Sequence, residues 1–256
     1  MGVATALFRY PVKSMGGERV EHLEFVESSA SGDRRWALVE PETGVFLSAK
    51  RNGILLEASA RTESDGSVVI TLPDGAELEA GEGATDDRLS DWIGRRVELR
   101  RPQSETSPSY EALGDALDEA SETQLFSGPS SHFADFADVH VLTTASLRAA
   151  TGLHAASDWD VRRFRPTILV DTGETGAGFV EDGWIGSRLV IGSAGFDVFM
   201  KTPRCNLPTR AQPGLERDTA VARVLRDEHE FCLGVYAAFR QPGIVSAGDP
   251  VRLEAL

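Results

Sequence analysis

Short apolar segments of strand length, separated by turn-forming residues, dominate the first part of the chain. Breaks such as Pro41–Gly44 and Pro73–Gly75 contain the proline, glycine and acidic residues that favour turns. Six such segments within about 100 residues predict a small barrel or sandwich. The predicted strands are Val3–Tyr10, Val20–Val26, Trp36–Val39, Val45–Ala49, Ser67–Leu72 and Val97–Leu99.

Helices are predicted at only a few places. Thr85 can cap a helix over Asp86–Ile93, whose first turn is acidic and which Gly94 would end. Two further helices are predicted, at Asp218–Glu230 and from Thr143 or Thr144. The remaining strands are predicted at Val139–Leu142, Thr167–Val170, Leu189–Ile191, Gly195–Phe199, Leu233–Phe239 and Val251–Leu253.

Residues 102–147 differ in composition from the rest, because they contain no Lys or Arg and begin with an acidic, Ser-rich stretch. We interpret residues 104–137 as an acidic connector, with one acidic helix at Tyr110–Ala120. A domain boundary is therefore expected here, between residues 1–103 and residues 138–256.

The overall composition is that of a soluble globular protein, with 41% hydrophobic and 26% charged residues among 256. The net charge of −14 argues against nucleic acid, whose recognition usually needs a basic face. No apolar run of about 18 residues is present to span a membrane, and the N-terminus does not resemble a secretory signal. With two cysteines only, a reduced, cytoplasmic compartment is expected.

Familiar catalytic templates are absent from the sequence. The five histidines show no HExxH or other metal-ligand spacing, and no P-loop, dinucleotide-binding glycine motif or GxSxG motif occurs. The glycine-rich stretch at residues 173–178 contains an acid, so a loop is expected there rather than a phosphate cradle. Function must therefore be sought in the distribution of charge and thiols.

Positive charge gathers in three segments of this acidic chain, none of which contains an acidic residue. They are residues 1–17 with Arg9 and Lys13, residues 161–166 with Arg162, Arg163 and Arg165, and residues 198–215 with Lys201, Arg204 and Arg210. Such segments favour an anion site assembled from distant parts of the chain, for example for a phosphate-bearing ligand. The alternative is a set of solvated arginines paired with surface acids.

Cys205 lies in the third cationic segment, between Arg204 and Asn206. A neighbouring guanidinium stabilises the thiolate, which is the form of cysteine that reacts and binds metals. A thiolate suits a transition metal better than Mg²⁺ or Ca²⁺. The alternative, a buried core cysteine, fits Cys232 better, because Cys232 begins the apolar run CLGVYAAF.

Eight short motifs follow one another over nearly the whole chain. They are Tyr10–Ser14 (YPVKS), Asp33–Val39 (DRRWALV), Arg163–Thr167 (RFRPT), Glu181–Gly186 (EDGWIG), Thr202–Cys205 (TPRC), Gly234–Tyr236 (GVY), Pro242–Ile244 (PGI) and Gly248–Val251 (GDPV). In this order they resemble the MOSC-domain proteins, which include the amidoxime-reducing component and the C-terminal part of molybdenum cofactor sulfurases. The resemblance implies a mainly β (α+β) fold, in which an N-terminal β-barrel domain precedes a MOSC β-barrel domain with a few short helices.

The resemblance also implies binding of the molybdenum cofactor (Mo-molybdopterin), a pterin dithiolene that ends in a phosphate. Cys205 occupies the place of the cysteine that supplies a thiolate to molybdenum in amidoxime-reducing relatives. The positions that match cofactor-contacting residues, or lie in motifs lining the same pocket, are Lys13, Ser14, Arg34, Arg165, Arg204 and Tyr236.

The chain departs from its relatives in three ways. Met15 stands where relatives often have cysteine, so a second thiol near the metal is lost. No [2Fe–2S] domain follows the last motif, so electrons are expected from a separate flavin, haem or Fe–S protein. The cysteine desulfurase domain of the sulfurases is missing and no lysine has a Schiff-base context, which argues against pyridoxal phosphate.

Three functions are compatible with the sequence. The first is a molybdenum-dependent oxidoreductase that reduces small N-hydroxylated or N-oxide compounds, with Cys205 as metal ligand and catalytic residue. The second is a carrier or sulfur-transfer module that holds the cofactor or a Cys205 persulfide. The third is a non-catalytic β interaction module with Cys205 in its core.

Overall fold

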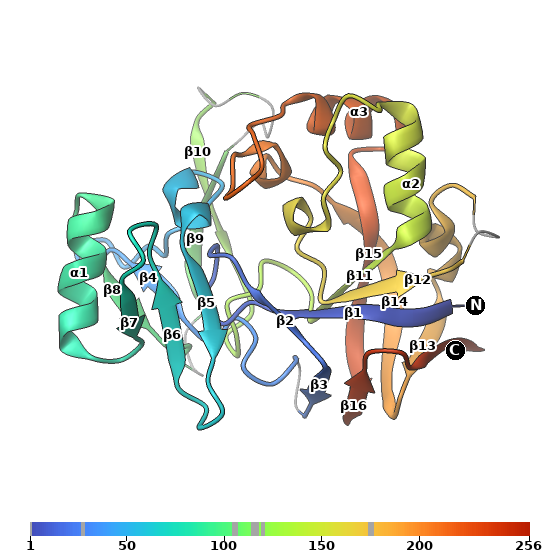
Figure 1. The fold of residues 1–256 in the computed structure, drawn as a ribbon, viewed down its shortest axis with the longest axis horizontal. Helices are drawn as coiled ribbons and strands as arrows, with labels where there is room; N and C mark the ends of the chain where they lie inside the picture. The colour runs from blue at the N-terminus through green and yellow to red at the C-terminus, as the bar shows by residue number, and fades with distance from the viewer. Residues whose placement is uncertain (1, 27–28, 104–106, 114–117, 119–120, 174–176) are drawn as a thin grey trace.

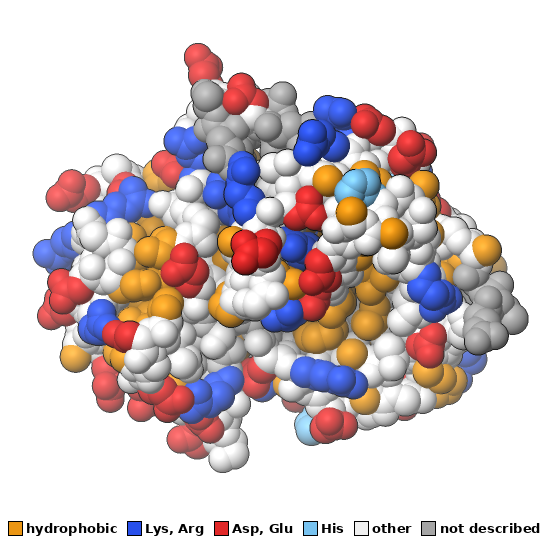
Figure 2. All heavy atoms as spheres, turned by 45° about the horizontal axis from the view of Figure 1, so that its top comes forward, with side chains coloured by type: hydrophobic (Ala, Val, Ile, Leu, Met, Phe, Trp, Pro, Cys, Tyr) orange, Lys and Arg blue, Asp and Glu red, His pale blue; other side chains and the backbone are white. Residues whose placement is uncertain are grey.

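A computed structural model of the protein describes residues 2–26, 29–103, 107–113, 118, 121–173 and 177–256. Two lobes lie side by side, a β-rich lobe that carries α1 and a barrel that carries α2 and α3 (Figure 1). Charged side chains of both signs gather near the middle of the face in Figure 2, where the lobes meet. The expected mainly β fold is confirmed.

The larger lobe is a closed barrel of seven strands. These are β1 (Gly2–Arg9), β11 (Val139–Thr143), β12 (Ile168–Asp171), β13 (Ser187–Ile191), β14 (Ala194–Pro203), β15 (Cys232–Gln241) and β17 (Pro250–Ala255). They follow one another in the order β12-β11-β15-β14-β13-β17-β1, and β1 pairs with β12 to close the ring. The start of the chain is therefore part of the barrel, while the boundaries expected at residues 103 and 138 stay a prediction.

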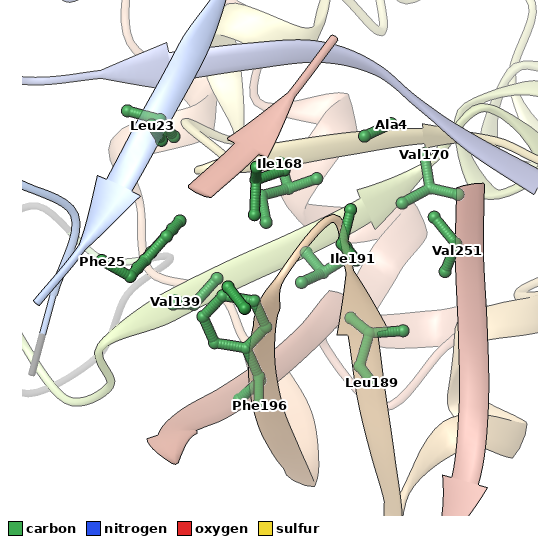
Figure 3. Close-up of a cluster of buried hydrophobic side chains, with 14 of the residues drawn as sticks. Ala4, Leu23, Phe25, Val139, Ile168, Val170, Leu189, Ile191, Phe196 and Val251 are labelled. Carbon is green, nitrogen blue, oxygen red and sulfur yellow. The ribbon is translucent and has the colours of Figure 1, made fainter. Parts of the chain in front are cut away.

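The barrel interior is filled by apolar side chains from strands far apart in sequence (Figure 3). Phe25 meets the edge of Phe196 there, with ring centroids 4.8 Å apart. Along β11, Val139 and Val141 face this core, whereas Leu142 faces outward onto α2 (Thr144–Leu153) and α3 (Ala220–Glu228). Both faces of β11 are therefore covered, and all five of its residues are buried, including His140 and Thr143.

The smaller lobe has its own hydrophobic core, built around short antiparallel strands. They are β4 (Ala37–Val39) with β8 (Glu98–Arg100), and β5 (Ser59–Thr62) with β6 (Val68–Thr71) and β7 (Glu77–Glu79). The helix α1 (Gly83–Ile93) covers them, and the 3₁₀ turn η1 (Gly53–Glu57) leads into β5. Three further pieces connect the lobes: β2 (Glu18–Val20) on β1, β3 (His22–Phe25) with β16 (Gly243–Ser246), and β9 (Ser109–Leu113) with β10 (Thr123–Ser127).

Helix ends follow the expected capping chemistry at two of three predicted places. Thr143 caps α2 by accepting a hydrogen bond from the Ser146 amide. Gly94 ends α1 in the left-handed conformation, with φ of 78°. Thr85, however, lies inside α1, which begins two residues earlier, and donates its hydroxyl to the Glu79 carbonyl. None of the described helices has the length and hydropathy that crossing a membrane requires.

Two predicted elements are wrong. Residues 110–113 of the expected acidic helix lie in β9, and residues 114–117 and 119–120 lie outside the described residues. Tyr110 is fully buried against Phe46, Phe126 and Phe133, so packing overrides the local helix propensity. The segment 45–49 is not a continuous strand either. Phe46 forms only isolated bridges to Val39 and Tyr110, and the Ala49 amide donates to the Ser14 hydroxyl.

Candidate functional site

A cavity of about 350 Å³ lies between the two lobes and receives every site residue predicted from the sequence. These residues are Lys13, Ser14, Arg34, Arg165, Arg204, Cys205 and Tyr236. They come from segments up to 223 positions apart, counting from residue 13 to residue 236. Segments that are cationic in the sequence thus meet in space, although the role of each residue stays a prediction.

Cys205 follows the end of β14, in the turn before the short 3₁₀ helix η4 (Leu207–Thr209). Its thiol is free and half-buried, and it lines the cavity. The next residue, Asn206, is buried and donates its side-chain amide to the Lys50 carbonyl at 3.0 Å, which ties this turn to the other lobe. Among the described residues, no three His, Cys, Asp or Glu side chains form a group that could hold a metal ion. A metal bound to Cys205 would therefore have to bring its other ligands with it, for example from a cofactor.

Three cavity residues have backbone conformations that residues other than glycine rarely adopt. Ser14, Arg34 and Arg165 have φ values of 69°, 49° and 53°, which cost about 1–2 kcal/mol each. Within the described ranges, five non-glycine residues share this property, and these three all line the cavity. Local hydrogen bonds hold them, such as that from the Arg34 amide to the Tyr10 carbonyl at 2.8 Å. Strain concentrated in this way is typical of a functional site.

The side of the cavity formed by the barrel, which we call the barrel wall, carries Arg165, Arg204 and Cys205. Arg165 donates to the Met15 carbonyl at 2.6 Å, and Arg204 donates to the Phe164 carbonyl at 2.9 Å. Neither guanidinium forms an ion pair with any residue that the structure describes, and Nε of Arg204 is buried without a partner. Burial lowers the pKa of Arg165 to about 10, so it is still charged at neutral pH.

The opposite side, which we call the N-terminal wall, carries Lys13, Arg34 and Lys50. Each of these cations is paired with a carboxylate. Asp135 bridges Lys13 and Lys50, with 2.8 Å between Asp135 Oδ2 and the Lys50 ammonium, and Asp33 pairs with Arg34. The positive charge of this wall is therefore partly neutralised before any ligand binds.

Burial and ion pairing shift the pKa values of Lys13 and Asp135, on the N-terminal wall, in opposite directions. Burial lowers the pKa of Lys13 to about 8, despite the neighbouring Asp135. Burial also raises the pKa of Asp135, but the two ammonium groups outweigh it and hold this pKa well below its usual range. Asp135 is thus ionised at every physiological pH.

Tyr236 lines the cavity from β15, beside aromatic rings that reach the surface. It stacks on Phe136, with centroids 6.0 Å apart, and meets the edge of His140 at 5.8 Å. Burial raises the pKa of Tyr236, so its hydroxyl stays protonated and able to donate. Phe136 is 62% exposed and also lines the cavity. This corner therefore offers an apolar rim beside the charged interior.

Sequence reasoning missed Lys50 and Asp135. Lys50 lies outside the three cationic segments, although it is one of only three lysines in the chain. Asp135 belongs to the stretch interpreted as a connector, where it is one acid among many. Only the folded chain brings these two side chains to Lys13.

The other cations of the three segments have structural or surface roles. Arg9 pairs with Glu18 and Arg162 with Asp160, each at 2.8 Å, and Lys201 pairs with Glu230 at 3.1 Å. Arg163 is buried and donates to four backbone carbonyls, those of residues 158, 208, 210 and 216. The alternative interpretation of solvated, paired charges thus holds for part of the set.

Cys232 differs from Cys205 as expected. It is buried at the start of β15, and its thiol donates to the Glu230 carbonyl at 3.4 Å. Burial raises the pKa of Cys232, which disfavours the thiolate. It is not among the residues that line the cavity.

Two β lobes that enclose a cavity lined by cations and one thiol define a β protein with a candidate anion site. Family comparison agrees with this class and makes it specific. The model for the MOSC N-terminal beta barrel domain matches residues 1–101, and the model for the MOSC domain matches residues 128–252. The chain belongs to the MOSC-domain family, which is known for binding the molybdenum cofactor.

Solved structures show a likeness of fold at low identity. The YuaD protein from Bacillus subtilis is 10% identical, with a TM-score of 0.50 over 100% of this chain and 96% of that one. YiiM from Geobacillus stearothermophilus is 14% identical over 51% of this chain and 67% of its own, with a TM-score of 0.33. Comparison with curated proteins finds no match.

Proposed function

We propose that the cavity binds the molybdenum cofactor through Cys205 and that the protein reduces small N-hydroxylated or N-oxide compounds. The observation that carries the proposal is the convergence of seven residues, predicted from motifs scattered between positions 10 and 236, on one cationic cavity. Random placement of such residues over the surface of two lobes would not produce this arrangement.

The residues fit the cofactor in three respects. A single free thiol suits a metal that brings its own sulfur ligands, because one protein thiolate then completes its coordination. Uncompensated guanidinium groups on the barrel wall suit an anionic tail. The volume, about 350 Å³, lies within the range of small-molecule sites.

Reduction of an N-hydroxyl compound breaks one N–O bond, consumes two electrons and two protons, and releases the amine-type product and water. The bound cofactor would supply the redox chemistry, which the side chains of this protein cannot carry out alone. The electrons would come from a separate flavin, haem or Fe–S protein.

The side chains themselves supply binding and orientation. Cys205 Sγ binds the metal and fixes its position at the end of β14. Arg165 and Arg204 hold the anionic part of the cofactor by charge-assisted hydrogen bonds, and their fixed backbone contacts keep them oriented. The protonated hydroxyl of Tyr236, on the neighbouring strand β15, can donate a hydrogen bond to the ligand.

Metal and pterin analysis tests cofactor binding. We expect molybdenum and fluorescent oxidised pterin in wild-type protein purified from a host that makes the cofactor, and loss of the metal in Cys205→Ser. Cys232→Ser is the matched control, because serine can keep the hydrogen bond to the Glu230 carbonyl, and it should retain both. Metal-free wild-type protein, or retention of molybdenum in Cys205→Ser, would refute the ligand assignment.

An activity assay separates the reductase from the carrier. Loaded protein and a chemical reductant should convert a hydroxylamine or N-oxide to its reduced product, and Cys205→Ser should not. If loaded protein reduces no such compound with any electron donor, the carrier or sulfur-transfer function is favoured instead.

A further inference from the structure

The cavity already contains an anion of its own, the carboxylate of Asp135. Asp135 lies between the ammonium groups of Lys13 and Lys50, with which it forms ion pairs. It lines the same cavity as Cys205 and Arg204. A phosphate bound to these lysines would therefore compete with Asp135 for the same donors.

Lys13 has no donor to spare for such a ligand. Its three N–H groups are used by Asp135, by the Phe133 carbonyl at 3.0 Å, and by the face of the Tyr110 ring, 3.9 Å from the nitrogen. Only 7% of Lys13 is exposed. An incoming anion can bind Lys13 only if Asp135 gives up its place.

The two carboxylates of the N-terminal wall differ in how firmly they are held. The side chain of Asp33 is 1% exposed and also accepts a hydrogen bond from the Tyr10 amide at 2.7 Å, so it belongs to the local fold. The side chain of Asp135 is 36% exposed and lies in a segment without helix or strand, before β11. Asp135 is therefore the carboxylate that a ligand can displace.

We propose that Asp135 is a specificity-determining residue that keeps free inorganic phosphate away from Lys13 and Lys50. To bind these two lysines, phosphate alone would have to displace Asp135 and would gain only the lysine contacts in return. A phosphate-bearing ligand that also binds Cys205 has a second source of binding energy and can displace it. Rejection of the wrong ligand by a competing charge is a general route to specificity. This inference rests on the proposed function for the identity of the admitted ligand.

Calorimetric titration of metal-free protein with inorganic phosphate at pH 7 tests the proposal. Asp135→Asn keeps the shape of the side chain but removes the competing charge, so phosphate affinity should rise at least ten-fold over wild type. Asp138→Asn is the matched control. Asp138 lies three residues away, is not among the residues lining the cavity, and accepts a hydrogen bond from the Phe239 amide, which asparagine can also do.

The opposite result has a clear meaning. If Asp135 instead holds the lysines in place for a ligand, Asp135→Asn will bind phosphate no better than wild type, or more weakly, and the proposal is overturned. Asp135→Ser provides a second variant if the asparagine variant does not give the circular dichroism spectrum of wild type. In Asp135→Asn/Lys50→Ala the gained affinity should disappear; its persistence would place the phosphate away from the lysines and also overturn the proposal.

The titration uses no metal, so it separates this inference from the proposed function. Wild-type protein that never acquires molybdenum, together with a ten-fold gain in Asp135→Asn, would refute the cofactor but keep the competition. Molybdenum in the wild type, without any gain of phosphate affinity in Asp135→Asn, would support the cofactor but refute the competition.

Discussion

The two walls of the cavity carry similar numbers of cations but hold them differently. On the N-terminal wall, Lys13, Lys50 and Arg34 are all paired with carboxylates. On the barrel wall, Arg165 and Arg204 donate to backbone carbonyls and form no ion pair within the described chain. A carbonyl orients a guanidinium without cancelling its charge, whereas a carboxylate does both.

This difference assigns the walls different tasks. The barrel wall offers its full charge to a ligand at all times. On the N-terminal wall, according to the proposal above, Lys13 and Lys50 offer their charge only to a ligand that can replace Asp135, while Arg34 stays paired with Asp33. Counting cations in the sequence would give the two walls equal weight, and the structure shows why that is wrong.

The largest expected effect tests what supports the barrel wall. Arg163 lies behind this wall and binds the carbonyls of residues 208, 210 and 216, which follow Cys205. Arg163→Ala removes the guanidinium from these carbonyls, of which that of residue 208 belongs to a buried residue, and should lower the free energy of unfolding by about 3 kcal/mol. Urea unfolding measures this loss. A loss below about 1 kcal/mol would mean that water replaces the guanidinium and that the wall does not depend on it.

The next effect compares the walls directly. Arg204→Ala removes an uncompensated charge and should reduce cofactor retention about ten-fold. Lys50→Ala removes a charge shared with Asp135 and should reduce it only about three-fold. Oxidised-pterin fluorescence of purified protein measures retention, with Arg9→Ala, which breaks a pair at 2.8 Å outside the cavity, as the unchanged control. The reverse ranking would contradict the division between the walls.

The pH dependence of stability should distinguish the walls as well. Burial lowers the pKa of Lys13 to about 8 in the folded protein, whereas an unperturbed lysine has a pKa of 10.5. Between these values the unfolded chain binds more protons, so stability rises with pH, by up to about 1.4 kcal/mol per unit. Urea unfolding of wild type and Lys13→Met from pH 8 to 9.5 isolates this contribution. If the difference in the free energy of unfolding between the two proteins stays constant over this pH range, Lys13 keeps its charge.

The smallest effect concerns the third arginine of the same motif. Arg162 is half-exposed and pairs with Asp160 on the surface at 2.8 Å. Arg162→Ala should change the free energy of unfolding by about 0.5 kcal/mol or less and leave cofactor retention unchanged. Urea unfolding and pterin fluorescence check both statements. A larger effect would mean that proximity in sequence, rather than the wall on which a residue lies, decides its role.

These three arginines also show what sequence can and cannot predict. Arg162, Arg163 and Arg165 look alike in VRRFRP, yet they become a surface pair, a buried support and a cavity residue. Of the three, the sequence predicts only Arg165 as a site residue, and this prediction comes from the motif resemblance rather than from charge. Their separate roles depend on the carbonyls and carboxylates that the fold brings to them, which are distant in sequence.

Strand prediction succeeded where apolar periodicity determines burial. All six strands predicted from Val139 onward are present, because their apolar faces form the barrel core. The helix at 110–120 was wrong because Tyr110 packs against rings at positions 46 and 133. The sequence did not predict Asp135 and Lys50 as cavity residues for the same reason. No local pattern shows which charge from a distant part of the chain will lie beside them.

Closure of the barrel by β1 has a consequence for biosynthesis. Gly2 and Val3 pair with Val251 and Pro250, so the first strand made must wait for the last before the ring is complete. The walls of the cavity likewise join residues 13 and 34 to residue 236. The pocket can therefore be complete only after β17 has left the ribosome, and a ligand that contacts both walls can bind only after that point.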